Sequence, residues 1–325
     1  MSKGYWNRVW KEFKRNRFAV AGLAVVSILF FIAIFSPIIA NNKPYVYVTE
    51  DRVYFPLFFD YDELRGKDLR KEKFEGLKVF PPVRYSPSEY DLNAIVVPPS
   101  KEHFLGTDEQ GRDLASRMLY GTRVSILVGF IAVFIYVSIG IIIGSIAGYY
   151  GGIVDILISR FIEIVMCFPT FFLILTILAL WGPSLVSVMV VIGITGWTGI
   201  ARIVRGEFLK LRELDYVTAS KALGARDSWI IFRHVLPNSL APVLVSATFG
   251  IASTILIESS LSFLGFGVQP PTPSWGDILS QSRDFMDFAW WLTIIPGLAI
   301  FITITAYNLV GEGLQDALDP KSVKK

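Results

Sequence analysis

Cysteine and histidine are almost missing from this chain of 325 residues, which contains one Cys and two His. The single cysteine, Cys167, excludes a disulfide framework within the chain and any cysteine-based metal cluster. Because it lies in an apolar run, we expect Cys167 to be a small buried hydrophobic residue. The patterns GxxxxGK[ST], HExxH and GxSxG are also missing, so the sequence predicts no cofactor or metal site and no nucleotide-binding P-loop in this chain.

Charge is scarce as well. Only 18% of the residues are charged, whereas 53% are hydrophobic and 14% aromatic, and the mean hydropathy is +0.50. This composition exceeds what a soluble domain of this size usually shows, so it indicates a polytopic membrane protein whose first partner is the lipid bilayer. The net charge of +3 is spread among loops and termini, which argues against nucleic acid as a partner.

Apolar runs of transmembrane length recur along the chain. Residues 1–17 contain six basic residues and one acidic residue, so this end is expected in the cytoplasm. Runs long enough to cross about 30 Å of hydrocarbon follow at 18–40, 124–147, 161–181, 185–201, 240–264 and 288–310. The sequence therefore predicts an all-α membrane protein with six transmembrane helices and both termini in the cytoplasm.

This topology divides the chain into four parts. We expect a cytoplasmic N-terminus and first transmembrane helix at 1–40, an extracytoplasmic insertion with an interfacial helix at 41–120, a five-helix core at 121–313 and a cytoplasmic tail at 314–325. The two histidines, His103 and His234, fall on opposite sides of the membrane here, so they cannot share a zinc site or a catalytic site.

The insertion is rich in charge, proline and aromatic residues. Alternating residues at 45–49 and 53–55 predict a small hairpin that turns near Glu50 and Asp51, and 66–75 reads as a solvated charge run. Thr107 and Gln110 have capping-box spacing and predict the start of an interfacial helix. The insertion is too short and broken for an enzyme domain; a cap on the outer mouth and an insertion without a role of its own both remain open.

Small and ionisable residues mark several of the predicted spans. Glycines 140, 144 and 148 recur every four residues, which predicts a close helix contact. Arg160 and Glu163 lie one turn apart and predict a local ion pair. Glu258 is deeper in the fifth span, whose polar residues suit the lining of a wet passage and form our candidate translocation pathway: Ser253, Thr254, Glu258, Ser259 and Ser262.

Glu258 leaves alternatives open. Its carboxylate could attract a peptide's amino terminus or hydrogen-bond a neighbouring helix. It could also be the ion or proton site of a secondary transporter or channel that works without ATP.

A polar, basic stretch at 215–238 separates two apolar runs and predicts two short helices. The first is expected from Asp215 to Leu223, with small residues on its surface and Gly224 as a left-handed C-cap. The second is expected to open at the N-cap Asp227 and to be closed by Pro237. Such a helical elbow is suited to being held by another protein, although an ordinary amphipathic loop would share its spacing.

The elbow resembles the EAA loop of ABC importer permeases, whose pattern is Glu-Ala-Ala, three residues, Gly, nine residues and Ile-x-Leu-Pro. The matching positions in this chain are Thr218, Ala219, Ser220, Gly224, His234, Leu236 and Pro237. Thr218 replaces the family's Glu, so contacts of that carboxylate cannot be carried over. The resemblance implies that the cytoplasmic loop 205–239 couples to an ATPase through nine residues: Thr218, Ala219, Ser220, Ala222, Leu223, Gly224, Ala225, Leu236 and Pro237.

Further segments look like the C-type permease subunits of oligopeptide and dipeptide importers, in the order 106–113 (GTDEQGRD), 148–155 (GYYGGIVD), 261–276 (LSFLGFGVQPPTPSWG) and 311–320 (GEGLQDALDP). The insertion, with 42–44 (NKP) and 53–56 (VYFP), is similar to that of Yej-type permeases, which also take up microcin C-like peptides.

The resemblance implies a type I ABC importer permease fold in the cytoplasmic (inner) membrane. It also implies a second homologous permease subunit, two cytoplasmic ATPases that bind and hydrolyse the ATP, and an extracytoplasmic peptide-binding protein. The chain itself would be a transport subunit and not an enzyme.

Overall fold

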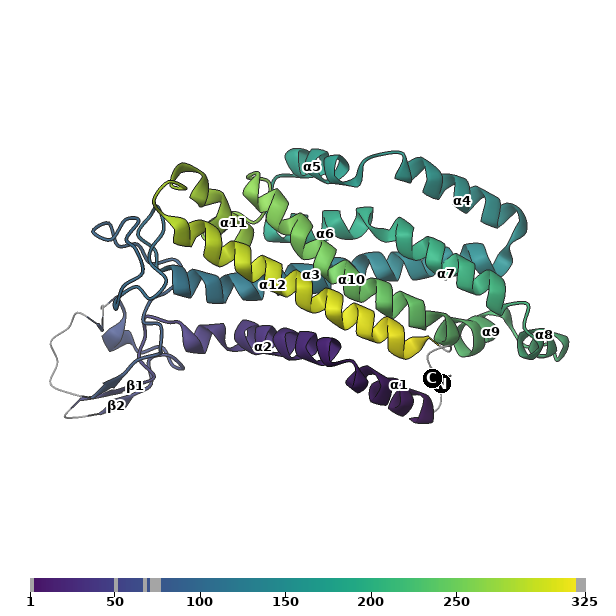
Figure 1. Ribbon diagram of the computed structural model, residues 1–325, viewed down its shortest axis with the longest axis horizontal. Helices are drawn as coiled ribbons and strands as arrows, with labels where there is room; N and C mark the ends of the chain where they lie inside the picture. The colour runs from purple at the N-terminus through teal and green to yellow at the C-terminus, as the bar shows by residue number, and fades with distance from the viewer. Residues whose placement is uncertain (1–2, 50–51, 67–68, 71–76, 320–325) are drawn as a thin grey trace. The chain divides into compact units, whose positions relative to one another are not determined.

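The computed structural model describes residues 3–49, 52–66, 69–70 and 77–319, most of which are helical (Figure 1). The helices before the elbow are α1 (Lys3–Arg15), α2 (Arg17–Ile39), α3 (Leu114–Tyr150), α4 (Gly152–Met166), α5 (Thr170–Trp181), α6 (Leu185–Thr195) and α7 (Trp197–Leu211). The elbow and the rest of the chain contribute α8 (Asp215–Ala222), α9 (Asp227–Ile230), the π-helical turn η2 (Ile231–Val235), α10 (Leu236–Phe263), α11 (Trp275–Gln281) and α12 (Trp290–Leu318). Two 3₁₀ turns, η1 (Asp62–Leu64) and η3 (Ser282–Asp284), complete the helical set.

Within the described residues, five helical stretches are long and apolar enough to cross a membrane, and a sixth span results if the bent pair α4 and α5 counts as one. The five are Arg17–Ile39, Leu114–Tyr150, Leu185–Leu211, Asp227–Phe263 and Trp290–Leu318. The predicted all-α membrane fold with six spans is therefore confirmed at this upper count. α3 has 37 residues, or about 55 Å at 1.5 Å per residue, so it is longer than the hydrocarbon layer of about 30 Å.

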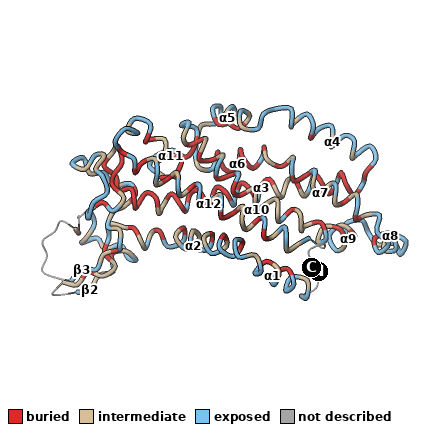
Figure 2. The backbone as a smooth tube through the Cα atoms, in the orientation of Figure 1, coloured by how far each residue is buried: buried red, intermediate tan, exposed pale blue. Residues whose placement is uncertain are grey.

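The third predicted span differs from a straight helix, because its two halves are bent by 77° between Met166 and Thr170. Pro169 lies in this break and disfavours helical geometry at Phe168, the residue before it. Cys167 lies at the bend and is exposed, so the prediction of a buried cysteine was wrong. Figure 2 shows that α4 and α5 are mostly exposed, which an apolar sequence alone does not reveal.

The chain divides into two compact units, the first formed by the described parts of Met1–Val26, Leu127–Glu258 and Phe301–Lys325. In this unit the predicted glycine stripe packs α3 against α7, and the contact is confirmed. A Cβ atom added to Gly144 would lie 2.5 Å from the carbonyl oxygen of Ala201, and one added to Gly148 would lie 2.5 Å from Cβ of Phe208. Larger side chains at these positions would push the two helices apart.

The second unit comprises Ser27–Ile126 and Ser259–Ile300. Its described part contains a three-stranded antiparallel sheet of order β2-β1-β3, made by β1 (Val46–Val48), β2 (Val53–Tyr54) and β3 (Lys78–Val79). Tyr47 pairs with Tyr54, so the two strands of the predicted hairpin are confirmed. Its turn at residues 50–51 and most of the predicted charge run at 66–75 lie outside the described residues.

The helix predicted to begin at Thr107 begins at Leu114 instead and runs directly into the span, so the prediction of a separate interfacial helix was wrong. Thr107 forms an isolated bridge with Asp113, and its hydroxyl accepts a hydrogen bond from the amide of Val97 at 2.8 Å. The helix is capped by Asp113, whose Oδ1 accepts from the amide of Ser116 at 2.8 Å. The capping-box spacing at Thr107 and Gln110 therefore lies in a loop, whose conformation is fixed by hydrogen bonds to other segments instead of by a helix.

Candidate functional site

The elbow, residues 215–238, lies entirely in the first unit and begins with the predicted helix α8. Its end is a Schellman motif: the amide of Gly224 donates to the carbonyl of Lys221 at 2.9 Å, and the amide of Ala225 donates to that of Ser220 at 3.1 Å. Gly224 has φ +79°, a left-handed conformation that most side chains disfavour. The predicted C-cap is confirmed.

Side chains on the inner face of the elbow hold it against the unit. Val217, Ile230 and Val235 are buried almost completely. The hydroxyl of Tyr149, at the end of α3, donates to Oδ1 of Asp227 at 2.6 Å, and the ammonium of Lys221 lies 5.1 Å from the centre of the Tyr149 ring. Both arms of the elbow are thus tied to one residue of α3.

Arg212 ties the start of the elbow to the same place. Its Nη1 donates to the carbonyls of Gly148 and Tyr149 at 3.2 and 3.3 Å. These carbonyls belong to the last turn of α3, where a cation is favoured by the helix dipole and satisfies groups that lack an intrahelical partner. The elbow is consequently anchored to the ends of α3 and α7.

The second arm differs from its prediction. Asp227 is the first residue of α9 and makes no capping hydrogen bond, because its carboxylate accepts from Tyr149. Pro237 does not close the arm either, since helical structure continues from Asp227 to Phe263. The π-helical turn at Ile231–Val235 precedes the proline, with the amide of Leu236 donating to the carbonyl of Ile231, and this widened turn lets the helix pass Pro237. Both predictions were wrong.

The outer face of the elbow is exposed and combines apolar with basic side chains. Leu223 is 88% exposed and Phe232 70% exposed, and Trp229 is half exposed. Of the nine predicted coupling residues, five are exposed and four partly exposed: Thr218, Ala219, Ala222, Leu223 and Gly224, then Ser220, Ala225, Leu236 and Pro237. Apolar side chains that stand free on a rigid polar segment are typical of a protein contact.

The hydroxyl groups of α8 are used locally. Thr218 Oγ1 donates to the carbonyl of Asp215 at 3.0 Å, and Ser220 Oγ donates to that of Tyr216 at 2.7 Å. Thr218 therefore brings neither a charge nor a free donor to the position where the EAA pattern has a carboxylate. The exposed face offers apolar side chains such as Leu223 together with the exposed basic residues Lys221, Arg226 and Arg233.

The candidate pathway residues of α10 are mostly buried inside their own chain. Thr254, Glu258, Ser259 and Ser262 are all less than one tenth exposed, whereas Ser253 is exposed. In the second unit, Ser262 Oγ accepts from the amide of Val268 at 3.2 Å and lies 3.3 Å from the donating hydroxyl of Ser274. A Cβ atom on Gly276 of α11 would lie 2.6 Å from Cα of Ser259, so α11 covers this part of α10. The assignment of these five residues to a pathway stays a prediction.

A buried charge cluster in the second unit was missed by sequence reasoning; it consists of Asp108, Arg112, Arg117 and Asp277. Oδ2 of Asp108 accepts from Nε of Arg112 at 2.7 Å and from Nη1 of Arg117 at 2.6 Å, and Nη2 of Arg117 donates to Oδ2 of Asp277 at 2.6 Å. Asp108 and both arginines are almost fully buried. Two of these residues, Asp108 and Arg112, lie in the family-like segment 106–113.

Burial raises the pKa of Asp277 to about 6, against the opposing effect of the positive charge on Arg112. Burial also raises the pKa of Asp113, whose Oδ2 lies 3.0 Å from Nδ1 of the buried His103. The pKa of Glu109 is raised by burial and then by the charge of Asp108. Of these carboxyl groups, Asp277 joins α11 to the first turn of α3 through Arg117.

Ion pairs also occur in the first unit. Arg160 and Glu163 form the predicted pair at 2.6 Å, with both side chains exposed. Arg205 of α7 pairs with Asp155 of α4, a contact across 50 residues that spacing could not predict.

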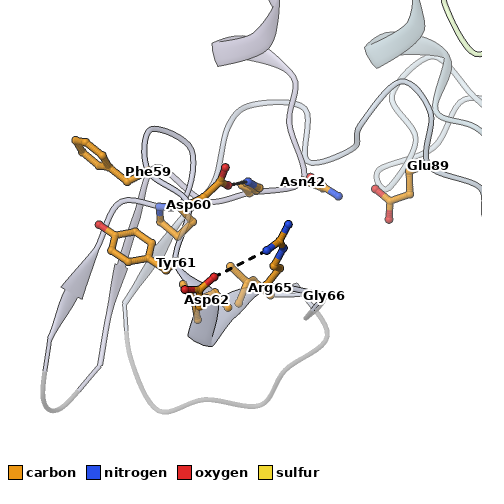
Figure 3. A pocket seen from close by; sticks show the side chains of 12 residues that line it. Asn42, Phe59, Asp60, Tyr61, Asp62, Arg65, Gly66 and Glu89 are labelled. Atoms are coloured by element: carbon orange, nitrogen blue, oxygen red, sulfur yellow. Dashed lines mark hydrogen bonds and ion pairs between the residues drawn. The ribbon is translucent and has the colours of Figure 1, made fainter.

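The segment between α2 and α3 contains an open cavity of about 640 Å³ (Figure 3). Charged and aromatic side chains border it, among them Asp60, Tyr61 and Arg65, and Asp62 lies 3.9 Å from Arg65. The ammonium of Lys43 forms an ion pair with Asp60 at 2.7 Å and lowers the pKa of that carboxyl group. The described lining of the cavity combines carboxylates with basic and aromatic side chains, so the cavity offers a polar surface.

The apolar helices and the exposed elbow define the chain as a multi-span membrane protein. Comparison with known proteins gives the family. Residues 140–324 match the model of the "binding-protein-dependent transport system inner membrane component", and residues 4–62 match the "N-terminal TM domain of oligopeptide transport permease C". The chain belongs to the family of binding-protein-dependent ABC transport permeases, which are membrane components and not enzymes.

Curated relatives cover nearly the whole chain. The dipeptide transport system permease protein DppC of Alkalihalophilus pseudofirmus is 37% identical over 316 residues, which is 97% of this chain and 90% of the relative. The glutathione transport system permease protein GsiD of Pectobacterium atrosepticum is 36% identical over 320 residues, covering 97% and 91%. The fold resembles an inward-facing structure of the MetNI methionine ABC transporter, with a TM-score of 0.52 at 17% identity over 63% of this chain and 98% of that one.

Proposed function

We propose that this chain is the permease subunit of an ATP-driven importer of dipeptides or oligopeptides, and that the elbow is the surface on which a cytoplasmic ATPase acts. The observation that carries the proposal is the exposed apolar face of the elbow on a segment fixed to α3 and α7. The substrate class is supported by the curated relatives, which are named for dipeptides and glutathione.

The partners follow from this role. An importer of this kind needs a second homologous permease subunit, two ATPases and an extracytoplasmic binding protein that delivers the peptide. Both termini and the elbow would then lie in the cytoplasm, in agreement with the six basic residues among the first 17. The segment 41–113 would lie outside, where its cavity could meet the delivery protein.

Movement would pass from the ATPase to the membrane through the elbow. Closing of the ATPase pair would press on the face around Leu223, and the bonds from Tyr149 and Arg212 would carry the displacement into α3 and α7. The cavity between the permease subunits would then change the side that it faces. ATP shifts this equilibrium only because it binds the two states with different affinity.

The translocation pathway would pass along α10. Ser253 is exposed on that helix and could meet the peptide directly, while the buried Thr254, Glu258, Ser259 and Ser262 would hold the shape of the wall. A strong fixed contact is not required there, because a pathway for many peptides gains little from tight binding to one of them.

The elbow is tested by replacing Leu223 with Asp in the complete transporter reconstituted in proteoliposomes. Leu223 is 88% exposed and supports no other side chain, so the variant should insert and fold normally. We expect ATP-dependent dipeptide uptake to fall at least roughly tenfold, since a desolvated charge in an apolar contact costs more than 1.4 kcal/mol. Leu92→Asp is the matched control, because Leu92 is 76% exposed in the segment between α2 and α3. Normal uptake by the Leu223 variant would reject the elbow as the contact.

The substrate class is tested separately with the same proteoliposomes and their binding protein. Uptake of a radiolabelled dipeptide should be inhibited by an excess of other dipeptides. Stronger inhibition by glutathione than by dipeptides would place this importer with the glutathione relatives. A lack of ATP-dependent uptake of either labelled dipeptide or labelled glutathione would remove the peptide proposal while leaving the ATPase contact untouched.

A further inference from the structure

The N-terminal helix α1 has two opposed faces. At 100° per residue, Tyr5, Trp6, Val9, Trp10 and Phe13 share one side of the helix, and Arg8, Lys11, Lys14 and Arg15 share the other. The helix is linked directly to the membrane-spanning α2, whose first turn is capped by Asn16: its Oδ1 accepts from the amides of Phe18 and Ala19, both at 3.1 Å.

Only part of the apolar face is covered by the chain itself. Val9 and Phe13 are buried. The Phe13 ring packs against Gly313 of α12, since a Cβ atom added to that glycine would lie 3.1 Å from the ring. This contact within the first unit fixes the rotation of α1 about its axis. Trp6 and Trp10 extend the same face beyond the contact and remain 43% and 49% exposed.

Most basic residues on the other face of α1 are not paired with any described carboxylate. Arg15 forms an ion pair with Glu12 at 2.9 Å, but Arg8, Lys11 and Lys14 have no carboxylate partner among the described residues. The ammonium of Lys14 lies 4.9 Å from the centre of the Trp10 ring, so a cation stands directly at the edge of the exposed aromatic surface. Tryptophan with neighbouring lysine is the combination found where lipid headgroups meet the acyl chains.

We propose that α1 is a binding site for anionic phospholipids on the surface of the bilayer, with Trp6 and Trp10 at the acyl boundary and Arg8, Lys11 and Lys14 against the headgroup phosphates. A lipid surface is favoured over a protein because α1 is separated from the span α2 by a single residue, Asn16, and must lie at the membrane surface. An amphipathic helix of this composition binds such surfaces through its buried apolar area and its attraction to negative lipids. The site depends on α2 being a span and not on the proposed peptide substrate.

The site is tested with an environment-sensitive fluorophore on Trp6→Cys in a Cys167→Ser background, using the full chain in nanodiscs made of equal parts phosphatidylcholine and phosphatidylglycerol. Bromine is placed on the acyl chains of only one of the two lipids at a time. We expect bromine on either lipid to quench the fluorophore. Bromine on phosphatidylglycerol should quench more strongly, because three unpaired cations should enrich that lipid locally by roughly threefold or more.

Removing the basic charges of α1 should remove the difference in quenching between the two lipids. The combined variant Arg8→Gln, Lys11→Gln and Lys14→Gln should be quenched equally by both, whereas Arg65→Gln with Lys101→Gln, two basic residues of the other unit, should change nothing. If the first variant fails to fold, 0.5 M NaCl is added to the protein with its basic residues unchanged. Screening by the salt should then reduce the preference for quenching by phosphatidylglycerol.

Three results would overturn the proposal. Equal quenching by both lipids before any basic residue is changed would remove the anionic preference. Absence of quenching by either lipid would place Trp6 away from the membrane. Loss of quenching when the ATPase subunits are added would assign the face to a protein partner.

Discussion

The elbow resembles a family motif, and two residues of the buried charge cluster lie in the family-like segment 106–113, yet the elbow and the cluster are stabilised in opposite ways. The elbow is shaped by backbone hydrogen bonds and caps, so its side chains on the outer face, such as Leu223, are left free. The cluster buries its charged side chains against one another, so Asp108 and Arg117 are about 1% exposed or less and cannot meet a partner at the surface. In this chain the family-like segments therefore contain both exposed side chains and buried ones that support the fold.

The largest effect on stability is expected for Asp108→Asn. Asp108 neutralises two buried guanidinium groups, and without its charge both would lie in a medium of low polarity. We expect a loss of about 3–5 kcal/mol in the free energy of unfolding, as for other broken buried ion pairs. Thermal unfolding in nanodiscs measures it, with the exposed Asp62→Asn as the control. Equal melting temperatures for the two variants would contradict the role of the cluster.

The next effect concerns pH. Because burial raises the pKa of Asp277 to about 6 from an ordinary value of 3.8, the folded state keeps a proton between these values that the unfolded state has lost. The free energy of unfolding should therefore fall as the pH rises from 4 to 6, by up to about 1.4 kcal/mol per pH unit. The difference between the unchanged chain and Asp277→Asn isolates this contribution, since Asp113 and Glu109 titrate in both proteins. Parallel pH profiles would show that Asp277 is not responsible.

A smaller loss is expected for Gly224→Val in the elbow. No other atom lies within 4 Å of a Cβ atom at this position, so the cost comes from the left-handed backbone, at φ +79°, and should be about 1–2 kcal/mol. Gly224→Asn should cost less, because Asn tolerates this conformation. Gly206→Val is the matched control, as Gly206 has equal space and no positive φ. A similar loss for both valine variants would point to a different cause.

The smallest effect on stability is expected for Leu223→Asp, within about 0.5 kcal/mol, because the residue is exposed. The same change should nevertheless abolish most ATP-dependent uptake. Melting temperature and uptake measured on one preparation would show whether stability and coupling separate at the elbow. A large drop in melting temperature would mean that Leu223 supports the fold.

Local sequence signals predicted the first arm of the elbow well. The helix α8 and its cap at Gly224 depend on neighbours within a few residues, and both predictions were confirmed. The cluster could not be predicted, because Arg117 and Asp277 are 160 residues apart and only the tertiary fold brings them together.

The wrong predictions arose where packing or an unexpected backbone geometry overrode a local sequence signal. An apolar run does not show which side packs, so Cys167 was expected to be buried although it lies exposed at a bend. Pro237 was expected to end a helix, but the π-helical turn before it lets the helix continue. The helix expected at Thr107 was replaced by a loop whose hydrogen bonds come from residues about ten positions away.

The most direct test of the account is the accessibility of position 223 in the assembled transporter. Leu223→Cys in a Cys167→Ser background is labelled with a water-soluble maleimide in the presence and absence of the ATPase subunits, with Leu92→Cys as the reference position. If the elbow is held by an ATPase, labelling at position 223 should slow by at least roughly tenfold when the ATPases are present, while labelling at position 92 stays constant. An unchanged labelling rate at position 223 would contradict the central claim.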